Sequence, residues 1–276
     1  MIKKIQFTKM AGAGNDFIVI EARKAKGLNL KKLAIAACDR TNGIGADGLL
    51  VLDKSKKADY RMRIINADSS EAEMCGNGAR CMAAYIVRNR KPRKKLFSME
   101  TIAGIILGEA KGEVANVRLS SPKDYRAHIP ITVSGRKIVV SYIDTGVPHT
   151  IVYVDKLAAI DVAKIGRIIR YHTKFKPRGT NVNFIEQARK NLIYARTYER
   201  GIEDETKACG TGSVASAIIT YLRANPTIKN EEKAKMNVRT AGGELLEITF
   251  DLIDGRVANV WLKGSANFIA KGEYYI

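Results

Sequence analysis

Two stretches of the chain, "CGNG" beginning at Cys75 and "CGTG" beginning at Cys209, place a cysteine directly before two glycines and a predicted helix. Glycine lets the backbone approach a partner closely and leaves amide groups open at a helix N-terminus. Such a terminus carries partial positive charge, attracts carboxylate or phosphate, and lowers the pKa of a cysteine from about 8.5. Each stretch therefore predicts an anion site with a reactive thiol beside it.

A matched pair of thiols that reaches one ligand from opposite sides suits inversion of a carbon next to a carboxylate. One thiolate removes the proton and a thiol on the other face returns it, while the helix termini stabilise the developing negative charge. The pattern predicts racemisation or epimerisation of an amino acid, with no cofactor and no metal. The alternative of two inert core cysteines explains the matched glycine turns less well. Cys75 and Cys81 have five residues between them, unlike the usual zinc spacing.

An internal repeat places the two cysteine turns in equivalent positions. At a shift of 134 residues and with no gap, Cys75 falls on Cys209 and Glu71 on Glu205. The same shift aligns Gly12 with Gly146, Gly45 with Gly179, Gly76 with Gly210, Gly78 with Gly212 and Ala83 with Ala217. Further on, "GEVANVRL" matches "GRVANVWL" at a shift of 143. The sequence predicts two copies of one unit, with the boundary near "SSPKDYRAHIP".

Both copies predict the same order of elements. The first has strands at 4–10 and 16–20, a helix at 30–38 and a strand at 60–66, and the second has strands at 137–143 and 150–154, a helix at 161–171 and a strand at 192–198. The cysteine turn and another helix follow in each copy. "CMAAYIV" and "VASAIITYL" are small and apolar nearly all round, which indicates buried helices. We expect an α/β fold of the α+β type, with strands around a central helix.

The composition is that of a globular protein, with 46% hydrophobic and 27% charged residues in 276. No apolar run approaches the roughly 20 residues that span a bilayer, and the N-terminus lacks the apolar core of a signal peptide. We expect a cytoplasmic protein that keeps its four cysteines as thiols.

The net charge of +19 raises the alternative of a nucleic-acid-binding protein. The densest basic run is "RNRKPRKK", residues 88–95, which follows the helix after Cys75. Positive side chains are favoured at a helix C-terminus, and charge runs usually serve solvation. We therefore favour a solvated helix end and treat nucleic acid as an unlikely partner.

Six motifs in order resemble the diaminopimelate epimerase family: "TKMAGAGNDFIVI", "DRTNGIGADGLL", "NADSSEAEMCGNGARC", "TGVPHT", "GTNVNF" and "YERGIEDETKACGTGSVA". The resemblance implies two lobes related by a pseudo-twofold axis, 1–122 plus 265–276 and 123–264. Each would be a mostly antiparallel mixed sheet around a central helix, with the active site between the lobes. The implied activity is cofactor-independent interconversion of LL- and meso-2,6-diaminopimelate, for lysine and cell-wall precursors, in a cytoplasmic homodimer.

The resemblance also implies roles for individual residues. Cys75 and Cys209 would be the catalytic acid and base. The substrate-binding residues would be Gly76, Asn77, Gly210 and Thr211 around the reacting carboxylate with Asn15 nearby, and Asn66, Asn181, Glu199 and Arg200 at the distal amino-acid end. A guanidinium can hold a carboxylate through two parallel hydrogen bonds. His149 would be an auxiliary residue beside the thiols, either titrating or ordering a turn.

Equivalent positions of the two copies carry different side chains, since Asn66 aligns with Arg200 and Asn15 with His149. Such asymmetry favours a substrate whose two ends must be distinguished. Three positions depart from the resemblance: Gly48 where the family often has Gln, Val147 where it often has Asn, and Ser69 where Gly is usual. These departures leave a racemase or isomerase of the same fold, acting on another amino acid, as an alternative.

Overall fold

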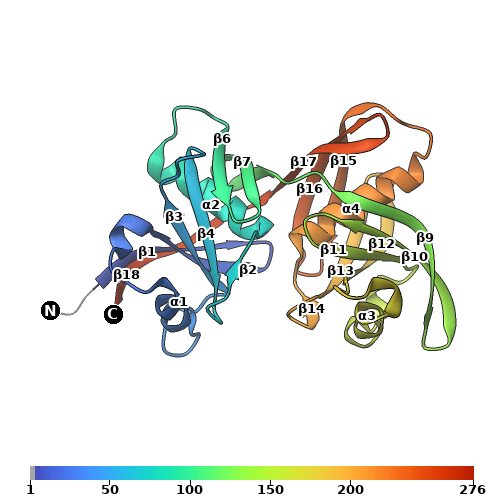
Figure 1. Cartoon of the computed structure of the whole chain (residues 1–276), viewed down its shortest axis with the longest axis horizontal. Helices are drawn as coiled ribbons and strands as arrows, with labels where there is room; N and C mark the ends of the chain where they lie inside the picture. Colours follow the sequence, from blue (N-terminus) through green and yellow to red (C-terminus); the bar gives the residue numbers. More distant parts are fainter. Residues whose placement is uncertain (1–3) are drawn as a thin grey trace. The chain divides into compact units, whose positions relative to one another are not determined.

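The computed structural model describes residues 4–276, which form two compact units (Figure 1). Unit 1 is Met1–Arg118 with Lys263–Ile276, and unit 2 is Leu119–Leu262. The chain passes from unit 1 to unit 2 just before the stretch "SSPKDYRAHIP", and it returns to unit 1 for its last strand.

Unit 1 contains a set of strands and two α-helices. Its elements are β1 (Lys4–Gly12), β2 (Asn15–Glu21), a 3-10 turn (Ala22–Ala25), α1 (Leu30–Cys38), β3 (Gly48–Asp53), β4 (Tyr60–Asn66), β5 (Glu71–Ala72), α2 (Gly76–Arg90), β6 (Phe97–Thr101), β7 (Gly104–Lys111), β8 (Val114–Arg118) and β18 (Asn267–Tyr275).

Unit 2 repeats this order, except that the counterpart of β18 comes first and one 3-10 turn is added. Its elements are β9 (Lys123–Val133), β10 (Arg136–Asp144), β11 (Pro148–Tyr153), a 3-10 turn (Leu157–Ala159), α3 (Val162–Arg170), a second 3-10 turn (Thr173–Phe175), β12 (Asn181–Arg189), β13 (Leu192–Glu199), β14 (Asp204–Thr206), α4 (Gly210–Ala224), β15 (Glu231–Thr240), β16 (Leu245–Ile253) and most of β17 (Arg256–Ser265).

Strand pairing is the same in both units. In unit 1 the pairs β2–β3 and β4–β6 are parallel, and in unit 2 the corresponding pairs β11–β12 and β13–β15 are parallel. The other pairings described within each unit are antiparallel. The last strand, β18, pairs with β1 as β9 pairs with β10. The mixed, mostly antiparallel fold expected from the sequence is confirmed, and the repeat extends to its topology.

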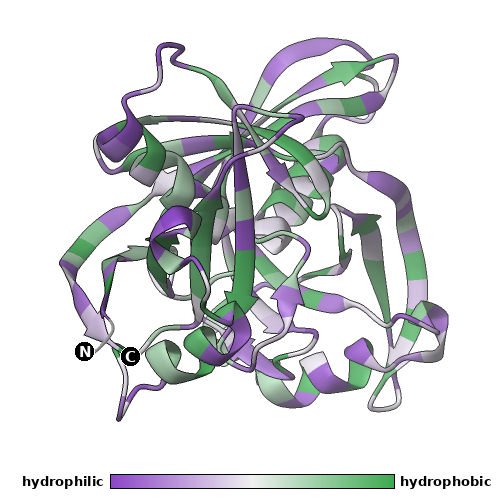
Figure 2. Ribbon diagram, turned by 60° about the vertical axis from the view of Figure 1, so that its left-hand side comes forward, coloured by the Kyte–Doolittle hydropathy of each residue, from purple (hydrophilic) through white to green (hydrophobic). Residues whose placement is uncertain are grey.

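A central helix in each unit lies within the strands. In α2 the run Gly76–Ile86 is buried, and α4 is buried to a similar extent. The strands β2 and β3 are covered on both faces, because α1 packs on one side and α2 on the other. The sequence of β3 is accordingly a continuous apolar run. Apolar residues follow the strands, whereas the connecting loops are largely hydrophilic (Figure 2).

The outer helix α3 of unit 2 packs through a glycine. A Cβ on Gly166 would lie 2.5 Å from Cβ of Tyr198, whose side chain is wholly buried in the core of the unit. Because Tyr198 cannot retreat, only glycine permits this approach of α3 to β13. Among the described residues, no helix is long and apolar enough to cross a membrane.

We expect Gly166→Ala to lower the free energy of unfolding by about 1–3 kcal/mol through overpacking. Helix propensity alone predicts the opposite sign, since alanine is favoured over glycine by about 1 kcal/mol inside a helix. Urea unfolding decides between the two. Lys164→Ala, at an exposed position of the same helix, is the control and should stay within about 0.5 kcal/mol of the parent protein. A stabilised Gly166→Ala variant would contradict the packing argument.

Candidate functional site

Cys75 and Cys209 are the N-cap residues of the two central helices. Both have extended backbones, with φ of −142° and −119°, and their carbonyl oxygens accept the first helical hydrogen bonds, from Ala79 at 2.8 Å and Ser213 at 2.9 Å. The Cys75 sulfur accepts a hydrogen bond from the backbone N–H of Gly78 at 3.5 Å. N-caps are usually oxygen side chains such as Ser or Asp. A sulfur in this position lies where the partial positive charge of the helix is concentrated.

Glycine at the third position of each central helix lies in close contact with a neighbouring strand, and the contact is tighter at Gly212 than at Gly78. A Cβ on Gly78 would lie 3.1 Å from Cδ2 of Leu50, and a Cβ on Gly212 would lie 2.2 Å from Oδ1 of Asn183. The first turn of each helix therefore lies directly against a strand of its own sheet. This contact fixes the position of the cysteine that precedes the turn.

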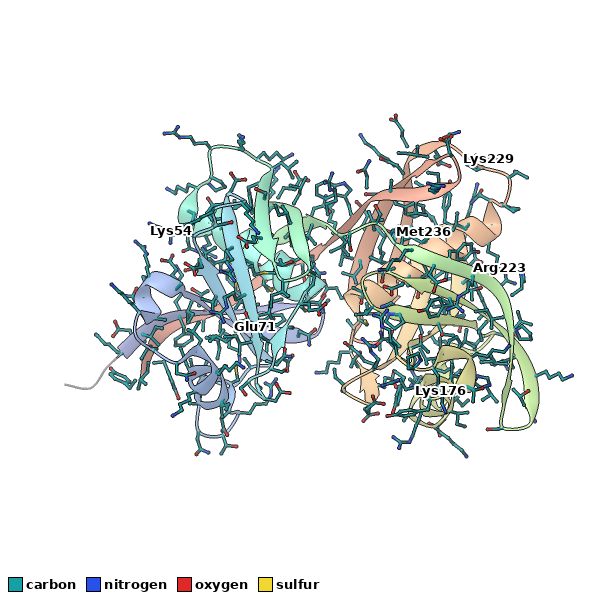
Figure 3. All side chains as sticks on the ribbon, in the orientation of Figure 1. Lys54, Glu71, Lys176, Arg223, Lys229 and Met236 are labelled. Atoms are coloured by element: carbon teal, nitrogen blue, oxygen red, sulfur yellow. The ribbon has the colours of Figure 1, made fainter. Side chains whose placement is uncertain are left out.

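A matched ion pair holds the short strand before each cysteine. In unit 1 Arg63 on β4 binds Glu71 on β5 through two hydrogen bonds of 2.7 and 2.9 Å, and Glu71 is labelled in Figure 3. In unit 2 Arg196 binds Glu205 through two hydrogen bonds of 2.7 Å each. Sequence reasoning aligned the two glutamates but missed the arginines. At the shift of 134 Arg63 falls on Thr197, one position from Arg196, so the arginines could be matched only by allowing a one-residue offset.

In unit 1, the predicted residue Asn15 contacts the start of α2. The Asn77 amide donates to Oδ1 of Asn15 at 2.7 Å, and the Asn15 amide donates to Asp47 at 2.9 Å. Asp47 in turn accepts from Arg40 at 2.6 Å. The structure therefore brings Asn15 and Asn77 together beside Cys75. Asn66, at the end of β4, pairs with Gly48, the residue after Asp47, and its side-chain amide donates to Ser70 at 2.9 Å.

Cys38, the last residue of α1, is a buried thiol near the charged residues Asp16 and Arg40. Burial opposes ionisation of Asp16, but hydrogen bonds from Arg40 and Lys9 outweigh it and lower the pKa of that carboxyl to about 2. Burial and the negative charge of Asp16 raise the pKa of the Cys38 thiol to about 11. Cys38 therefore remains protonated at neutral pH.

In unit 2, Asn181 joins three strands near their ends. Its Oδ1 accepts the backbone N–H of Arg200 at 2.8 Å, and its amide donates to the carbonyl of Pro148 at 2.9 Å. The Arg200 guanidinium donates to the carbonyl of Arg178 at 3.3 Å. Burial, and the neighbouring charges of Arg178 and Arg170, lower the pKa of Arg200. An anion bound at Arg200 would relieve this repulsion.

Glu199 is a largely desolvated carboxyl next to Arg200. Burial raises its pKa, and a hydrogen bond of 3.0 Å from the hydroxyl of Thr206 only partly offsets this effect. A cation placed against Glu199 would favour its ionised form. Glu199 and Arg200 thus offer adjacent sites of opposite charge, as a zwitterionic ligand requires.

His149 is completely buried at the second position of β11, beside Asn181 in the register of β11 and β12. Burial, and then the charge of Arg200, lower its pKa to about 3. The sequence left two roles open for His149, a titrating group or a residue that orders a turn. At neutral pH the buried ring is neutral and acts as a hydrogen-bonding group.

The structure bears on two of the three departures. A Cβ on Gly48 would lie 3.0 Å from the carbonyl oxygen of Ile65, so a larger residue there requires that strand to shift. Ser69 adopts φ of 71°, the left-handed region that glycine occupies without strain. Nothing in the structure explains Val147.

No group of three His, Cys, Asp or Glu side chains with the geometry of a metal site occurs among residues 4–276. The predicted site residues lie near the starts of the central helices and at neighbouring strand ends of each unit. Cys209, Gly210 and Thr211 form the start of α4, and the Cys209 sulfur lies 3.5 Å from the Thr211 hydroxyl.

Comparisons with known proteins agree on the family. The family model described as diaminopimelate epimerase matches residues 7–122 and 141–269. A diaminopimelate epimerase of Aquifex aeolicus is 37% identical over 98% of this chain and 97% of its own length. One of Methanocella arvoryzae is 41% identical over 98% of this chain and 96% of its own length.

Solved structures share the fold at low sequence identity. A phenazine biosynthesis protein of the PhzF family from Bacillus anthracis superposes with a TM-score of 0.74 and 18% identity, over 99% of this chain and all of its own. A hydroxyproline epimerase of Agrobacterium vitis, solved with bound trans-4-hydroxy-L-proline, gives a TM-score of 0.71 and 14% identity, over 99% of this chain and 93% of its own.

We expect iodoacetamide at pH 8 to alkylate Cys75 first in the native protein. Cys75 is partly exposed, whereas Cys209 is 7%, Cys38 2% and Cys81 0% exposed. The thiolate is the reacting species, and the raised pKa of Cys38 suppresses it further. Peptide mass spectrometry after short labelling gives the order, with urea-unfolded protein as the control in which all four react. Early labelling of Cys38 or Cys81 would contradict the assignment of reactive and structural thiols.

We expect Glu199→Gln to stabilise the fold at neutral pH. Since the pKa of Glu199 is higher in the folded than in the unfolded protein, its contribution to stability is fully present below the unfolded pKa of about 4.3 and is lost as pH rises through the folded pKa. Gln cannot ionise, so the variant does not lose this stability as pH rises, and its side-chain oxygen can still accept the hydrogen bond from Thr206. Urea unfolding at pH 4 and pH 7 measures the difference. A gain at pH 4 equal to that at pH 7 would show that the charge is not its cause.

Proposed function

The chain belongs to the diaminopimelate epimerase family, and from this premise we propose that Cys75 and Cys209 are the acid and base that interconvert LL- and meso-2,6-diaminopimelate. The observation that carries the proposal is the duplicated placement of these cysteines, each as the N-cap of a buried helix. The two positions are equivalent in the repeat, as a reaction with one acid and one base on opposite faces requires.

The reaction uses the two thiols in turn. The thiolate of one cysteine takes the α-proton, which leaves the electron pair on the α-carbon and its carboxylate. The thiol of the other cysteine then gives a proton to the opposite face and becomes the thiolate. No cofactor is required for this balance, and the reverse reaction exchanges the two roles.

The helix starts supply charge stabilisation for the intermediate. Gly76 and Asn77 begin α2, and Gly210 and Thr211 begin α4, with their backbone N–H groups in the first helical turn. Preorganised amide donors of this kind are the usual means of stabilising an oxyanion. We propose that they bind the reacting carboxylate, with Asn15 contacting Asn77 from the side.

The distal end of the substrate is assigned to Asn66, Asn181, Glu199 and Arg200. Glu199 would pair with the distal ammonium and Arg200 with the distal carboxylate, which supports the choice of a diamino diacid over a simple amino acid. The lowered pKa of Arg200 and the raised pKa of Glu199 both indicate groups that lack a counter-charge of the required sign.

Two arginines of the basic run at 88–95 make contacts within the fold, and this supports our view that nucleic acid is an unlikely partner. Arg88 stacks over the ring of Phe268 at 4.3 Å, and Arg90 pairs with the buried Glu21 at 2.9 Å. These contacts tie the end of α2 to β18 and β2. The homodimer stays a prediction from the family resemblance, and the cytoplasmic location stays a prediction from the sequence composition.

We expect Cys75→Ala and Cys209→Ala each to reduce epimerisation by about 100-fold or more, the usual range for loss of a positioned acid or base. The measurement is conversion of LL-diaminopimelate in deuterium oxide, with deuterium counted at the α-carbon. Cys81→Ala is the matched control, because Cys81 lies on α2 but is wholly buried. Near-normal turnover by either site variant would refute the two-thiol reaction, and faster exchange of proline or histidine would refute the substrate.

A further inference from the structure

Asn183 lies between β12 and the start of α4. It is completely buried, and its Oδ1 occupies the space that a Cβ on Gly212 would need, at 2.2 Å. Gly212 is in the first turn of the helix that Cys209 caps. The Asn183 side chain thus contacts the first turn of α4, the helix that Cys209 caps.

Both polar ends of the Asn183 amide are engaged. Its Nδ2 donates to the carbonyl of Thr150 at 3.2 Å and lies 3.1 Å from Nδ1 of His149. Its Oδ1 accepts from the hydroxyl of Thr197 at 2.9 Å. The carbonyl of Thr150 is an acceptor only, so the amide end facing it must be the NH₂ group. The flipped amide would place two acceptors against each other in a buried site.

This orientation determines the tautomer of His149. Since Nδ2 of Asn183 is a donor, Nδ1 of His149 must present its lone pair, and the proton of the neutral ring is on Nε2. His149 Nε2 is buried and has no hydrogen-bond partner among residues 4–276. A buried donor without an acceptor is destabilising, and a ligand atom that accepts from it removes this penalty.

The repeat indicates where that ligand binds. His149 aligns with Asn15, and Asn15 contacts Asn77 at the start of α2. The residue aligned with Asn77 is Thr211, at the start of α4. By this correspondence His149 lies beside the start of α4. The proposed function places the reacting carboxylate at that helix start.

We propose that Asn183 is a positioning residue that holds His149 as the Nε2–H tautomer, making His149 a fixed, neutral hydrogen-bond donor to the substrate carboxylate. The inference rests on the proposed function for the identity of the acceptor. In this arrangement His149 neither takes nor gives the α-proton, and the two thiols carry the whole proton transfer.

Nitrogen NMR of protein labelled with ¹⁵N-histidine tests the tautomer. The chain has three histidines, and His149→Gln assigns the signal. We expect ligand-free His149 to show an unprotonated Nδ1 and a protonated Nε2 from pH 5 to pH 9, and LL-diaminopimelate to shift the Nε2–H resonance. A proton on Nδ1, an imidazolium at pH 7, or an Nε2–H unchanged by bound substrate would overturn the proposal.

Asn183→Asp tests the positioning role. A carboxylate beside Nδ1 should draw the proton to that nitrogen and remove the Nε2–H donor. We expect kcat to fall about 100-fold, because the substrate carboxylate gains charge in the reaction, and KM to rise, because the bound substrate loses a hydrogen bond. Thr197→Val is the matched control, because it removes the hydrogen bond to Oδ1 while the Thr150 carbonyl still orients the amide. We expect that variant to keep the tautomer of the parent protein and most of its kcat.

An Asn183→Asp variant with the parent tautomer and kcat would overturn the inference. If this variant does not fold, the tautomer of His149 in the parent protein and in Thr197→Val decides. A changed tautomer in Thr197→Val would contradict the role of the Thr150 carbonyl in orienting Asn183. Failure of the parent protein to exchange the α-hydrogen would refute the proposed function separately, because the tautomer is measured without ligand.

Discussion

Each unit is organised around a buried helix whose first turn presses against a strand of its own sheet. The backbone N–H groups of that turn point out of the helix and need partners. The cysteine N-cap supplies one through sulfur at Cys75, and glycine at the third helical position makes the close approach possible. A larger residue at Gly212 would require the helix or Asn183 to shift, and one at Gly78 would press on Leu50. The close packing of the first turn therefore helps to fix the position of the cysteine before it.

The duplicated scaffold carries different chemistry at equivalent points. In unit 1, Asn15 connects Asn77 to Asp47, in a chain of contacts that ends in the charges of Arg40 and Asp16. In unit 2, the corresponding strand position is His149, buried and neutral, and Asn181 holds the backbone of Arg200. The ion pairs Arg63–Glu71 and Arg196–Glu205 make the same contact in both units. The structural contacts are thus repeated, whereas the groups that would meet a ligand differ.

Much of the fold follows from local pattern. The predicted strands and helices, including 4–10, 30–38, 60–66 and 161–171, correspond to β1, α1, β4 and α3, because hydrophobic periodicity and N-cap residues act within a few positions of the chain. The repeat was visible because equivalent glycines serve equivalent turns: Gly45 and Gly179 both have positive φ, of 76° and 62°. The order of strands within each sheet was not derivable from periodicity, since pairing joins distant segments.

The sequence by itself determined the family, the duplication, and the two cysteines that begin buried helices, because each depends on residue types at short spacing. The tertiary structure decided which polar groups are buried together. Asn183 and His149 are 34 positions apart, and their contact follows from the parallel pairing of β11 with β12. The raised pKa of Cys38 and the lowered pKa of His149 likewise depend on desolvation by distant segments, for which no local pattern exists.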